Sequence, residues 1–352
     1  MMNESAESRE AVCKVSICVP TFNGSRYLRL AIESARAQTF RDFELLIVDD
    51  DSTDDTVAIA EEAARVDSRV RVYRNPRRLG LAGNWNRCLE LASGEWIKFL
   101  FQDDSLQPAC VERLFKLGTD SGATLVACRR KFEFDSSVGE EFKRSFLVHA
   151  AENDLNRRFP DHAGTITAGE FAAYAAKYPA LNCIGEPTAT MFRRSAVAEF
   201  GNFNADLMQA IDWEYWLRIA VTRGLSYLDE SLATFRLHDG GATFANMRRP
   251  LILDLLIIYH ELAYKPHYAA VRAAARETGV DLKQKLFGLC RSAQPGAVGS
   301  NGTQSSASVS AEDWNRLVKS YPRLRFPQLN YLMLRSVDKL KSQLKTRTRT
   351  TG

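Results

Sequence analysis

Short apolar runs and amphipathic segments alternate along the first hundred residues of the chain. The apolar runs have the length expected of buried strands and lie at residues 14–20, 43–48, 70–73 and 96–101. Between them, apolar side chains recur at helical spacing in residues 28–38, 57–64 and 84–92. Strands that alternate with helices in this way predict a parallel sheet flanked by helices.

Asp103 and Asp104 lie just beyond the apolar run at residues 96–101, after Gln102. Ligands of open α/β sheets bind at the carboxyl ends of the strands. Two adjacent carboxylates repel each other, and a divalent cation with oxygen ligands relieves this repulsion. A metal site is therefore one interpretation of the pair. The other is a turn and helix cap, with Pro108 in the first turn of the next helix.

A second acidic cluster follows the run at residues 43–48. Ser52 and Asp55 have the spacing of a capping box, which predicts that a helix starts there. Asp50 precedes this cap at the tip of the strand, where a carboxylate more often faces a ligand. We therefore interpret Asp50 as a candidate binding residue and Ser52 as a cap.

Neither of the common phosphate-binding motifs, Gly-x-Gly-x-x-Gly and Gly-x-x-x-x-Gly-Lys, follows the first predicted strand. A diphosphate at this sheet would need another way to be held. A metal ion on Asp104 is the natural candidate.

The composition bounds the class of protein. The 352 residues are 45% hydrophobic and 26% charged, as in ordinary globular proteins, and a formal net charge of +4 is too small to indicate nucleic-acid binding. Seven cysteines without a Cys-x-x-Cys pair favour a reducing compartment. The N-terminus lacks the pattern of a signal peptide, and no apolar run approaches ~18 residues. We expect a cytoplasmic protein that reaches a membrane at most peripherally, from the cytoplasmic face.

Five sequence blocks together resemble the GT-A domain of family 2 glycosyltransferases. They follow the family's order and spacing at residues 15–23 (VSICVPTFN), 38–54 (QTFRDFELLIVDDDSTD), 84–87 (NWNR), 94–97 (GEWI) and 102–104 (QDD). The resemblance covers about residues 14–240. It implies an α/β fold of the GT-A type, which is Rossmann-like with a mostly parallel sheet between helices.

The resemblance implies transfer of a sugar from a nucleotide-diphosphate donor, with uridine as the favoured base, to a hydroxyl of a glycan or lipid-linked acceptor. It also implies inversion at the anomeric carbon, Mn²⁺ or Mg²⁺ as cofactor, and a role in surface polysaccharide or glycoconjugate synthesis. The residues that it implies for nucleotide binding are Pro20, Thr21, Phe22, Asp50, Asn86 and Asp103. The metal ligands that it implies are Asp104 and His238, whereas Phe101 stands where many members carry another Asp.

Asp212 lies at the first turn of a predicted helix and resembles the second acid of the family's Glu-Asp block, although Ile211 replaces the usual first acid. The resemblance implies that Asp212 is the general base, because a carboxylate within reach of the attacking hydroxyl suffices. The alternative is a carboxylate that only favours the helix dipole. His238 has a similar alternative as a structural loop residue, and Glu214 is a second, weaker candidate for the base.

The predicted organisation has five parts: a disordered N-terminus, a GT-A domain with a nucleotide-sugar half and an acceptor half, a helical extension, a disordered linker, and a C-terminal helix with a basic tail. Their bounds are 1–13, 14–245 (halves 14–130 and 131–245), 246–292, 293–311 and 312–352. Residues 131–179 read as an insertion that shapes the acceptor pocket, and residues 225–228 and 232–235 as two late strands. The basic residues 339–349 are either a solvated charged end or a contact for anionic lipid.

Two other classes of function remain open. A nucleotidyltransferase also uses a doubly wound sheet and a metal held by Asp, but it normally carries a glycine-rich basic loop that residues 21–26 do not match. A catalytically weak or inert module that binds a nucleotide sugar or a glycan is the other, because Phe101 removes one acid from the expected motif.

Overall fold

The computed structural model describes residues 13–162, 164–247, 250–297 and 309–325. The chain forms two compact units: unit 1 comprises residues 1–171 and 181–246, and unit 2 comprises residues 172–180 and 247–352. The sequence placed the end of the GT-A domain at residue 245, next to this division. Most of the predicted N-terminal segment, the middle of the linker and the basic tail lie outside the described residues.

Unit 1 is built on a sheet that has nine strands within the described residues, in the order β3-β2-β1-β4-β8-β6-β9-β5, with β7 paired to β9. The four strands predicted from the first hundred residues run parallel and are β1 (Val15–Thr21), β2 (Phe43–Asp49), β3 (Val70–Arg74) and β4 (Trp96–Phe99). The others are β5 (Ser105–Leu106), β6 (Leu125–Phe134), β7 (Thr165–Ile166), β8 (Thr190–Arg193) and β9 (Leu225–Leu237). Strand β8 is antiparallel to β4 and β6, whereas β6 and β9 are parallel.

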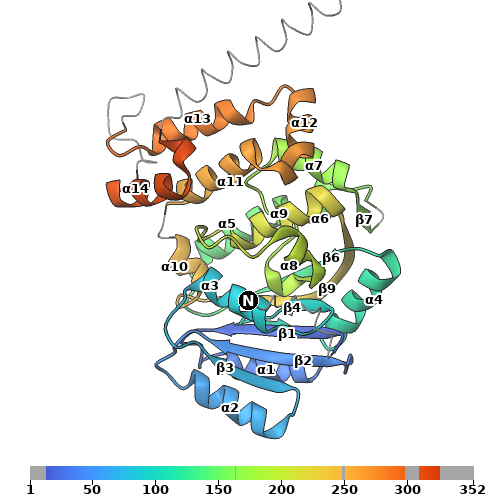
Figure 1. Cartoon of the computed structure of the whole chain (residues 1–352). Helices are drawn as coiled ribbons and strands as arrows, with labels where there is room; N and C mark the ends of the chain where they lie inside the picture. The colour runs from blue at the N-terminus through green and yellow to red at the C-terminus, as the bar shows by residue number, and fades with distance from the viewer. Residues whose placement is uncertain (1–12, 163, 248–249, 298–308, 326–352) are drawn as a thin grey trace, which may run out of the picture. The chain divides into compact units, whose positions relative to one another are not determined.

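Ten helices, two of which have residues in both units, accompany this sheet in the described part of the chain (Figure 1). They are α1 (Leu28–Arg36), α2 (Thr56–Val66), α3 (Leu81–Leu91), α4 (Cys110–Ser121), α5 (Glu140–Glu152), α6 (Leu155–Arg158), α7 (Ala168–Lys177), α8 (Ser195–Phe200), α9 (Ile211–Arg223) and α10 (Ala242–Met247). The helices that belong to both units are α7, which is divided after Phe171, and α10, of which the last residue, Met247, lies in unit 2.

The central parallel strands are buried on both faces. One face packs against α1, α2 and α4 in a single apolar cluster that includes Ile32 and Leu114. On the other face, Phe99 of β4 stacks on Phe192 of β8 with ring centroids 6.4 Å apart, and Phe192 contacts Tyr215 of α9 at 5.5 Å. Burial on both faces explains why these strands read as continuous apolar runs rather than as alternating ones.

Strand β5 was not predicted from the sequence. Its two residues pair antiparallel with β9, which lies far along the chain. A strand this short has no periodicity of its own, so only its partner defines it. The alternative interpretation of Asp103 and Asp104 as a helix cap is wrong, because α4 begins at Cys110 and its N-cap residue, Ala109, makes no side-chain cap.

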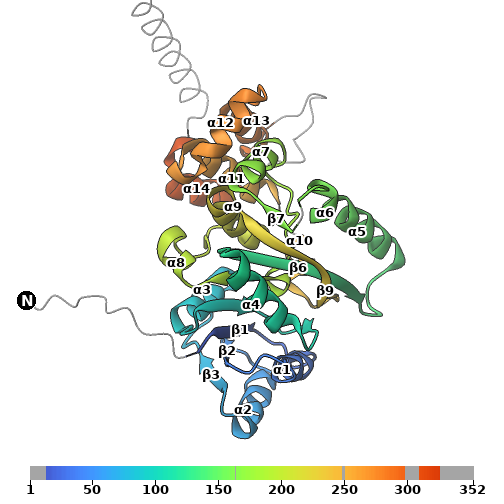
Figure 2. The same cartoon turned by 90° about the vertical axis from the view of Figure 1, so that its right-hand side faces the viewer.

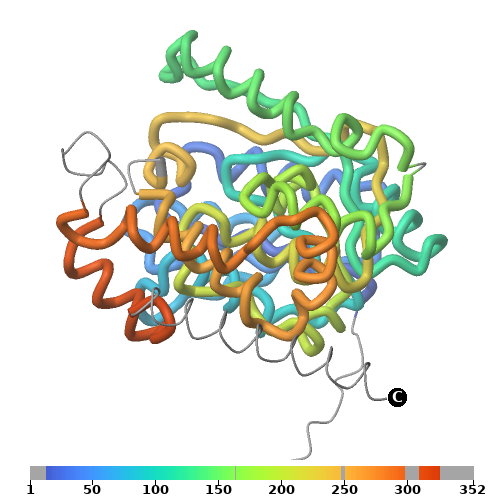
Figure 3. The backbone as a smooth tube through the Cα atoms, turned by 90° about the horizontal axis from the view of Figure 1, so that it is seen from above, coloured from blue at the N-terminus to red at the C-terminus, as the bar shows by residue number. Residues whose placement is uncertain are grey.

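The predicted insertion at residues 131–179 contains the end of β6 and then α5, α6, β7 and α7. In Figure 2 and Figure 3, α5 lies along the outside of unit 1 beside β6. Phe146 of α5 contacts Phe132 and Phe134 of β6, with ring centroids 5.1 and 5.9 Å apart. The proposed role of this segment in shaping an acceptor pocket stays a prediction.

The two late strands predicted at residues 225–228 and 232–235 are one continuous strand, β9. Its pairing with β6 shifts register on either side of Arg129. A β-bulge interrupts the alternation of inward and outward side chains. The sequence pattern is therefore interrupted although the strand continues.

Unit 2 is helical in its described residues, which confirms the predicted helical C-terminal extension. Besides part of α7, it contains α11 (Ile252–Tyr264), α12 (Ala269–Glu277), α13 (Leu282–Ala293) and α14 (Ala311–Ser320). Leu256 and Leu262 of α11 and Leu286 of α13 are buried. Ser310 caps α14, because its hydroxyl accepts a hydrogen bond from the Asp313 amide at 3.1 Å.

Within the residues that the structure describes, no helix combines the length and the apolar character needed to cross a bilayer.

The contact between α4 and β4 is tight enough to test. A methyl group on Gly118 of α4 would lie 2.2 Å from the indole ring of Trp96, which is fully buried. We expect Gly118→Ala to lower the free energy of unfolding by about 1–3 kcal/mol, measured by chemical denaturation. Gly139→Ala is the matched control, because nothing lies within 4 Å of the added methyl group. Equal stability of both variants would contradict this packing.

Candidate active site

The loop after β2 is held by Asp49, which is fully buried. Its carboxylate accepts hydrogen bonds from the Thr21 hydroxyl at 3.1 Å and from the Ser52 amide at 2.9 Å. The Ser52 hydroxyl donates to Asp49 and accepts a hydrogen bond from the Asn23 amide at 2.9 Å, on the loop after β1. The capping box predicted at Ser52 and Asp55 is therefore wrong: α2 begins at Thr56, and Asp54 accepts from the Thr56 amide at 3.1 Å.

Asp50 lies at the end of the same strand and is only 2% exposed. Its carboxylate accepts three hydrogen bonds, from the Asn75 side chain at 3.0 Å and from the amides of Leu79 and Gly80 at 2.7 and 2.8 Å. Asp50 thereby holds the loop between β3 and α3 against the carboxyl end of β2. Its role in nucleotide binding stays a prediction.

Phe22 follows β1 and is partly exposed at this edge of the sheet. The Gln102 side chain holds its backbone at both ends: the Phe22 amide donates to Oε1 at 2.9 Å, and Nε2 donates to the Phe22 carbonyl at 3.2 Å. The Arg78 guanidinium lies over the Phe22 ring, 3.8 Å from its centroid. Sequence reasoning gave no role to Gln102, although it follows the predicted strand at residues 96–101, or to Arg78, which lies in a loop without a helical or strand pattern.

The other residues predicted for nucleotide binding have structural contacts. Pro20 and Thr21 are buried within β1. Asn86 of α3 binds the backbone of Phe203 twice, donating from Nδ2 to the carbonyl at 3.0 Å and accepting from the amide at 2.9 Å. Their roles in nucleotide binding stay predictions.

Asp103 and His238 form a pair at the carboxyl end of β4. Nε2 of His238 lies 3.1 Å from Oδ2 of Asp103, and the side chain of Asp103 is 19% exposed. The ring of Tyr27 packs against His238 with centroids 4.9 Å apart. Nδ1 of His238 is buried and has no hydrogen-bond partner in the described part of the chain. His238 and Asp104 were predicted together as metal ligands, whereas the His238 imidazole contacts Asp103.

Asp104 is 1% exposed, and both of its carboxylate oxygens accept hydrogen bonds. Thr188 donates its hydroxyl to Oδ2 at 2.5 Å, and Arg236 donates its backbone amide to Oδ1 at 2.9 Å. Burial, with the Asp103 carboxylate next to it, raises the pKa of Asp104 well above its usual range. These contacts favour Asp104 as an anchor for Thr188 and Arg236, and its role as a metal ligand stays a prediction.

Lys98 of β4 is a buried cation that the sequence analysis missed inside an apolar run. Its ammonium group donates to the carbonyls of Phe99, at 2.9 Å, and of Thr188. Burial lowers the pKa of Lys98, and the nearby Asp104 counteracts part of this effect. Lys98 therefore binds the segment that carries Thr188 to the end of β4.

Asp103 and His238 carry groups of the kind that a divalent cation accepts, and a bound substrate would have to supply further ligands. No group of three or more His, Cys, Asp or Glu side chains that could hold a metal occurs in the described residues. The pair of Asp103 and His238 offers one carboxylate and one imidazole, beside the otherwise unpartnered Nδ1 atom. Mn²⁺ accepts oxygen and imidazole ligands, and a site with few protein ligands leaves room for phosphate oxygens.

Asp212 lies in the first turn of α9 and is partly exposed. Its Oδ1 accepts a hydrogen bond from the Trp213 amide at 2.7 Å, and its Oδ2 accepts from the Asn182 side chain at 3.4 Å. Burial, together with the nearby Glu186 carboxylate, raises the pKa of Asp212 to about 7. A carboxylate with such a pKa can accept a proton near neutral pH.

Glu214, the weaker candidate for the base, is buried and paired with Arg218 at 2.8 Å. Arg218 also donates to the carbonyls of Phe200 and Asn202. This ion pair ties α9 to the chain after α8 and leaves Asp212 as the acid of this helix that is partly exposed.

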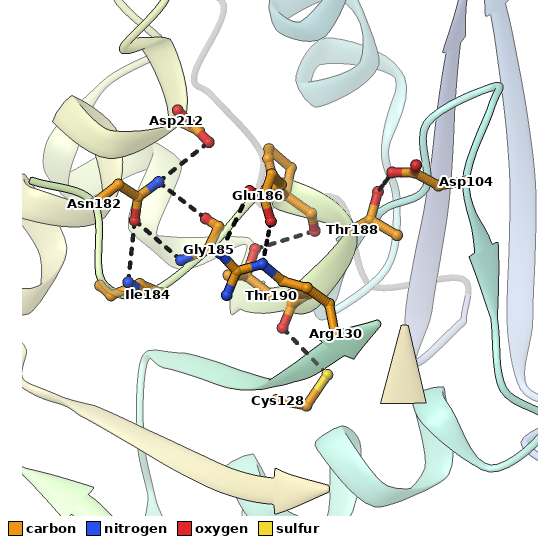
Figure 4. A network of polar contacts seen from close by, with 12 residues as sticks. Asp104, Cys128, Arg130, Asn182, Ile184, Gly185, Glu186, Thr188, Thr190 and Asp212 are labelled. Atoms are coloured by element: carbon orange, nitrogen blue, oxygen red, sulfur yellow. Dashed lines mark hydrogen bonds and ion pairs between the residues drawn. The ribbon is translucent and has the colours of Figure 1, made fainter. Parts of the chain in front are cut away.

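One segment, residues 182–190, connects the two acidic sites, and we call it the bridging segment (Figure 4). At one end, Asn182 contacts Asp212, and at the other, Thr188 contacts Asp104. Between them, Glu186 forms an ion pair with Arg130 of β6. Sequence reasoning did not find Asn182, Glu186 or Arg130, because they follow no helical or strand pattern and come together only in the folded chain.

Comparison with known proteins identifies the family. The sequence profile described as Glycosyl transferase family 2 matches residues 16–201, more than half of the chain. The chain is 33% identical over 222 residues to an uncharacterised protein of Mycobacterium tuberculosis, covering 63% of this chain and 66% of that protein. It is 36% identical over 140 residues to the GalNAc(5)-diNAcBac-PP-undecaprenol beta-1,3-glucosyltransferase of Campylobacter jejuni, covering 40% and 45%. The chain thus spans less than two thirds of these relatives' length.

Solved structures share the fold. TarS 1-349 of S. aureus, in complex with UDP-GlcNAc, superposes with a TM-score of 0.57 at 16% identity, covering 90% of this chain and 88% of that one. The mannosyltransferase PcManGT of Pyrobaculum calidifontis, in complex with GDP-Man and Mn²⁺, gives a TM-score of 0.51 at 16% identity, covering 95% and 90%. These likenesses confirm the predicted GT-A fold. The profile match over more than half of the chain shows that the chain belongs to glycosyl transferase family 2.

Proposed function

We propose that the protein transfers a sugar from a nucleotide-diphosphate donor to an acceptor hydroxyl. The observation that carries this proposal is the arrangement of two acidic sites, one at Asp103 and one at Asp212, joined by the bridging segment (Figure 4). Structural neighbours in complex with UDP-GlcNAc and GDP-Man support a nucleotide sugar as the donor.

On the donor side, the partly exposed ring of Phe22 would lie beside the nucleoside, and Asp103 with His238 would hold Mn²⁺ or Mg²⁺. When bound there, the cation supplies Lewis-acid stabilisation of the negative charge on the departing nucleoside diphosphate. Arg236, whose guanidinium donates to the Asp103 carbonyl at 3.0 Å, keeps this loop in place. A UDP-sugar is the donor that we favour.

On the acceptor side, Asp212 would accept the proton of the attacking hydroxyl as the new glycosidic bond forms. A single base opposite the leaving group is what inversion at the anomeric carbon requires, and we propose an inverting reaction. Relatives named as an undecaprenol-linked glucosyltransferase and as chondroitin synthases support a glycan or lipid-linked acceptor in polysaccharide or glycoconjugate synthesis.

A binding module without turnover is the second candidate, and Phe101 favours it. Its ring stacks on Trp85 with centroids 5.0 Å apart, at the position where many family members carry an acid. Slow hydrolysis of a nucleotide sugar without acceptor would separate the two candidates, because an inert module leaves the donor intact.

The first prediction concerns the base. We expect Asp212→Asn to lower kcat by about 10²–10⁴-fold, because the amide cannot accept the proton. Donor hydrolysis and transfer are measured by release of the nucleoside diphosphate. Asp206→Asn, an exposed acid before the same helix, is the control and should keep the activity. Near-normal turnover by Asp212→Asn would remove this residue from the mechanism.

The second prediction concerns pH. Because the pKa of Asp212 is raised to about 7, its carboxylate is protonated below that pH and cannot act as a base. We expect kcat/KM to rise as the pH increases through about 7 and to level off above it. A profile that stays flat down to pH 5 would contradict the role of Asp212 as the base.

The third prediction separates Asp103 from Asp104. Thermal unfolding is followed with UDP and UDP-sugars, with and without Mn²⁺, because a ligand of the native state raises Tm. We expect Asp103→Asn to lose the part of the shift that depends on Mn²⁺. Asp104→Asn should instead lower the Tm of the free protein, because an amide cannot accept both hydrogen bonds. Loss of the Mn²⁺-dependent shift in Asp104→Asn alone would assign the metal to Asp104.

A further inference from the structure

Glu186 is a charged residue of the site for which the proposed reaction has no role. It lies in the bridging segment, and Figure 4 shows it between Asp212 and Asp104. Its two carboxylate oxygens face the guanidinium of Arg130, which reaches across from β6. The side chains of Glu186 and Arg130 are only 22% and 13% exposed.

The backbone around Glu186 is shaped to receive this ion pair. Gly185 has φ +114°, and a Cβ atom there would lie 3.0 Å from Nη1 of Arg130. Asn182 holds the turn by accepting hydrogen bonds from the amides of Ile184 and Gly185, both at 3.0 Å. The Trp216 indole donates to the Gly185 carbonyl at 3.1 Å. The position of Glu186 is therefore fixed by β6 and α9 as well as by the turn of its own segment.

Two charged groups that act on Asp212 are Glu186 of the bridging segment and Arg130 of β6. The Glu186 carboxylate disfavours ionisation of Asp212, whereas the Arg130 guanidinium favours it. On α9 itself, Glu214 is neutralised by its pair with Arg218. The balance between Glu186 and Arg130 is thus the electrostatic contact through which the bridging segment acts on Asp212.

We propose that Glu186, held by Arg130, controls the proton occupancy of Asp212 and is a positioning residue of the acceptor site. This inference rests on the proposed function, because it concerns the protonation state of Asp212, the proposed general base. Removing the negative charge of Glu186 makes the Asp212 carboxylate easier to form, and the released Arg130 cation acts in the same direction. The ion pair thereby keeps the base protonated to a higher pH than burial alone would.

The test is a titration of Asp212 in wild type and in Glu186→Gln. The protein is labelled with ¹³C at aspartate carboxyl groups, and Asp212→Asn assigns the resonance. We expect the midpoint to move down by about one pH unit in Glu186→Gln. The acidic limb of the kcat/KM profile should move by the same amount. Glu186→Asp, which keeps the charge, should restore a midpoint close to that of wild type.

The matched control is Glu95→Gln, which breaks another ion pair of unit 1, with Arg193 at 2.8 Å, and should leave the midpoint unchanged. An unchanged midpoint in Glu186→Gln, in a variant whose unfolding temperature matches that of wild type, would overturn the inference. A midpoint that moves while the kcat/KM limb does not would support the inference and contradict the use of Asp212 as the base.

Discussion

Two opposite charges buried at the end of β4 set the geometry on which the site depends. Asp104 and Lys98 are 1% and 0% exposed, so neither group can be satisfied by water. A buried charge is tolerated only where specific partners replace its hydration. For Asp104 these partners are the Thr188 hydroxyl and the Arg236 amide, and for Lys98 they include the Thr188 carbonyl. Segments far apart in the sequence must therefore meet at this strand end.

The need to bind these buried groups also positions the residues that the proposed reaction uses. Once the Arg236 amide is bound to Asp104, His238 lies two residues further along the chain, and its imidazole reaches Asp103. Once Thr188 is bound, Glu186 and Asn182 extend from it toward α9. The proposed donor and acceptor sites are thus ends of one hydrogen-bonded framework rather than two separate loops.

The acids of this edge differ in what they are available to do. Asp49 and Asp50 are buried and accept several hydrogen bonds from neighbouring loops, so they hold the backbone in place. Asp103 and Asp212 keep part of their surface exposed, and fewer donors from the protein engage them. Exposure and free acceptor capacity, rather than residue type, distinguish a group that can meet a substrate from one that supports the fold.

The sequence by itself determined the parallel half of the sheet, the family and the strand ends at which the acids gather. These features are local: buried parallel strands are continuous apolar runs, and the family's blocks are short and ordered along the chain. It did not determine β5, the single strand β9, or the correct role of Ser52, because each depends on a partner elsewhere in the fold.

The tertiary structure alone decided which acids are neighbours. In the folded chain, His238 contacts Asp103. Thr188 and Arg236 donate hydrogen bonds to Asp104, and the charges of Glu186 and Arg130 act on Asp212. The hydrogen-bonded pairs among these join residues that are 84 to 135 positions apart. Hydrogen bonds and charge interactions act over a few ångströms in space, and no pattern along the chain encodes that distance.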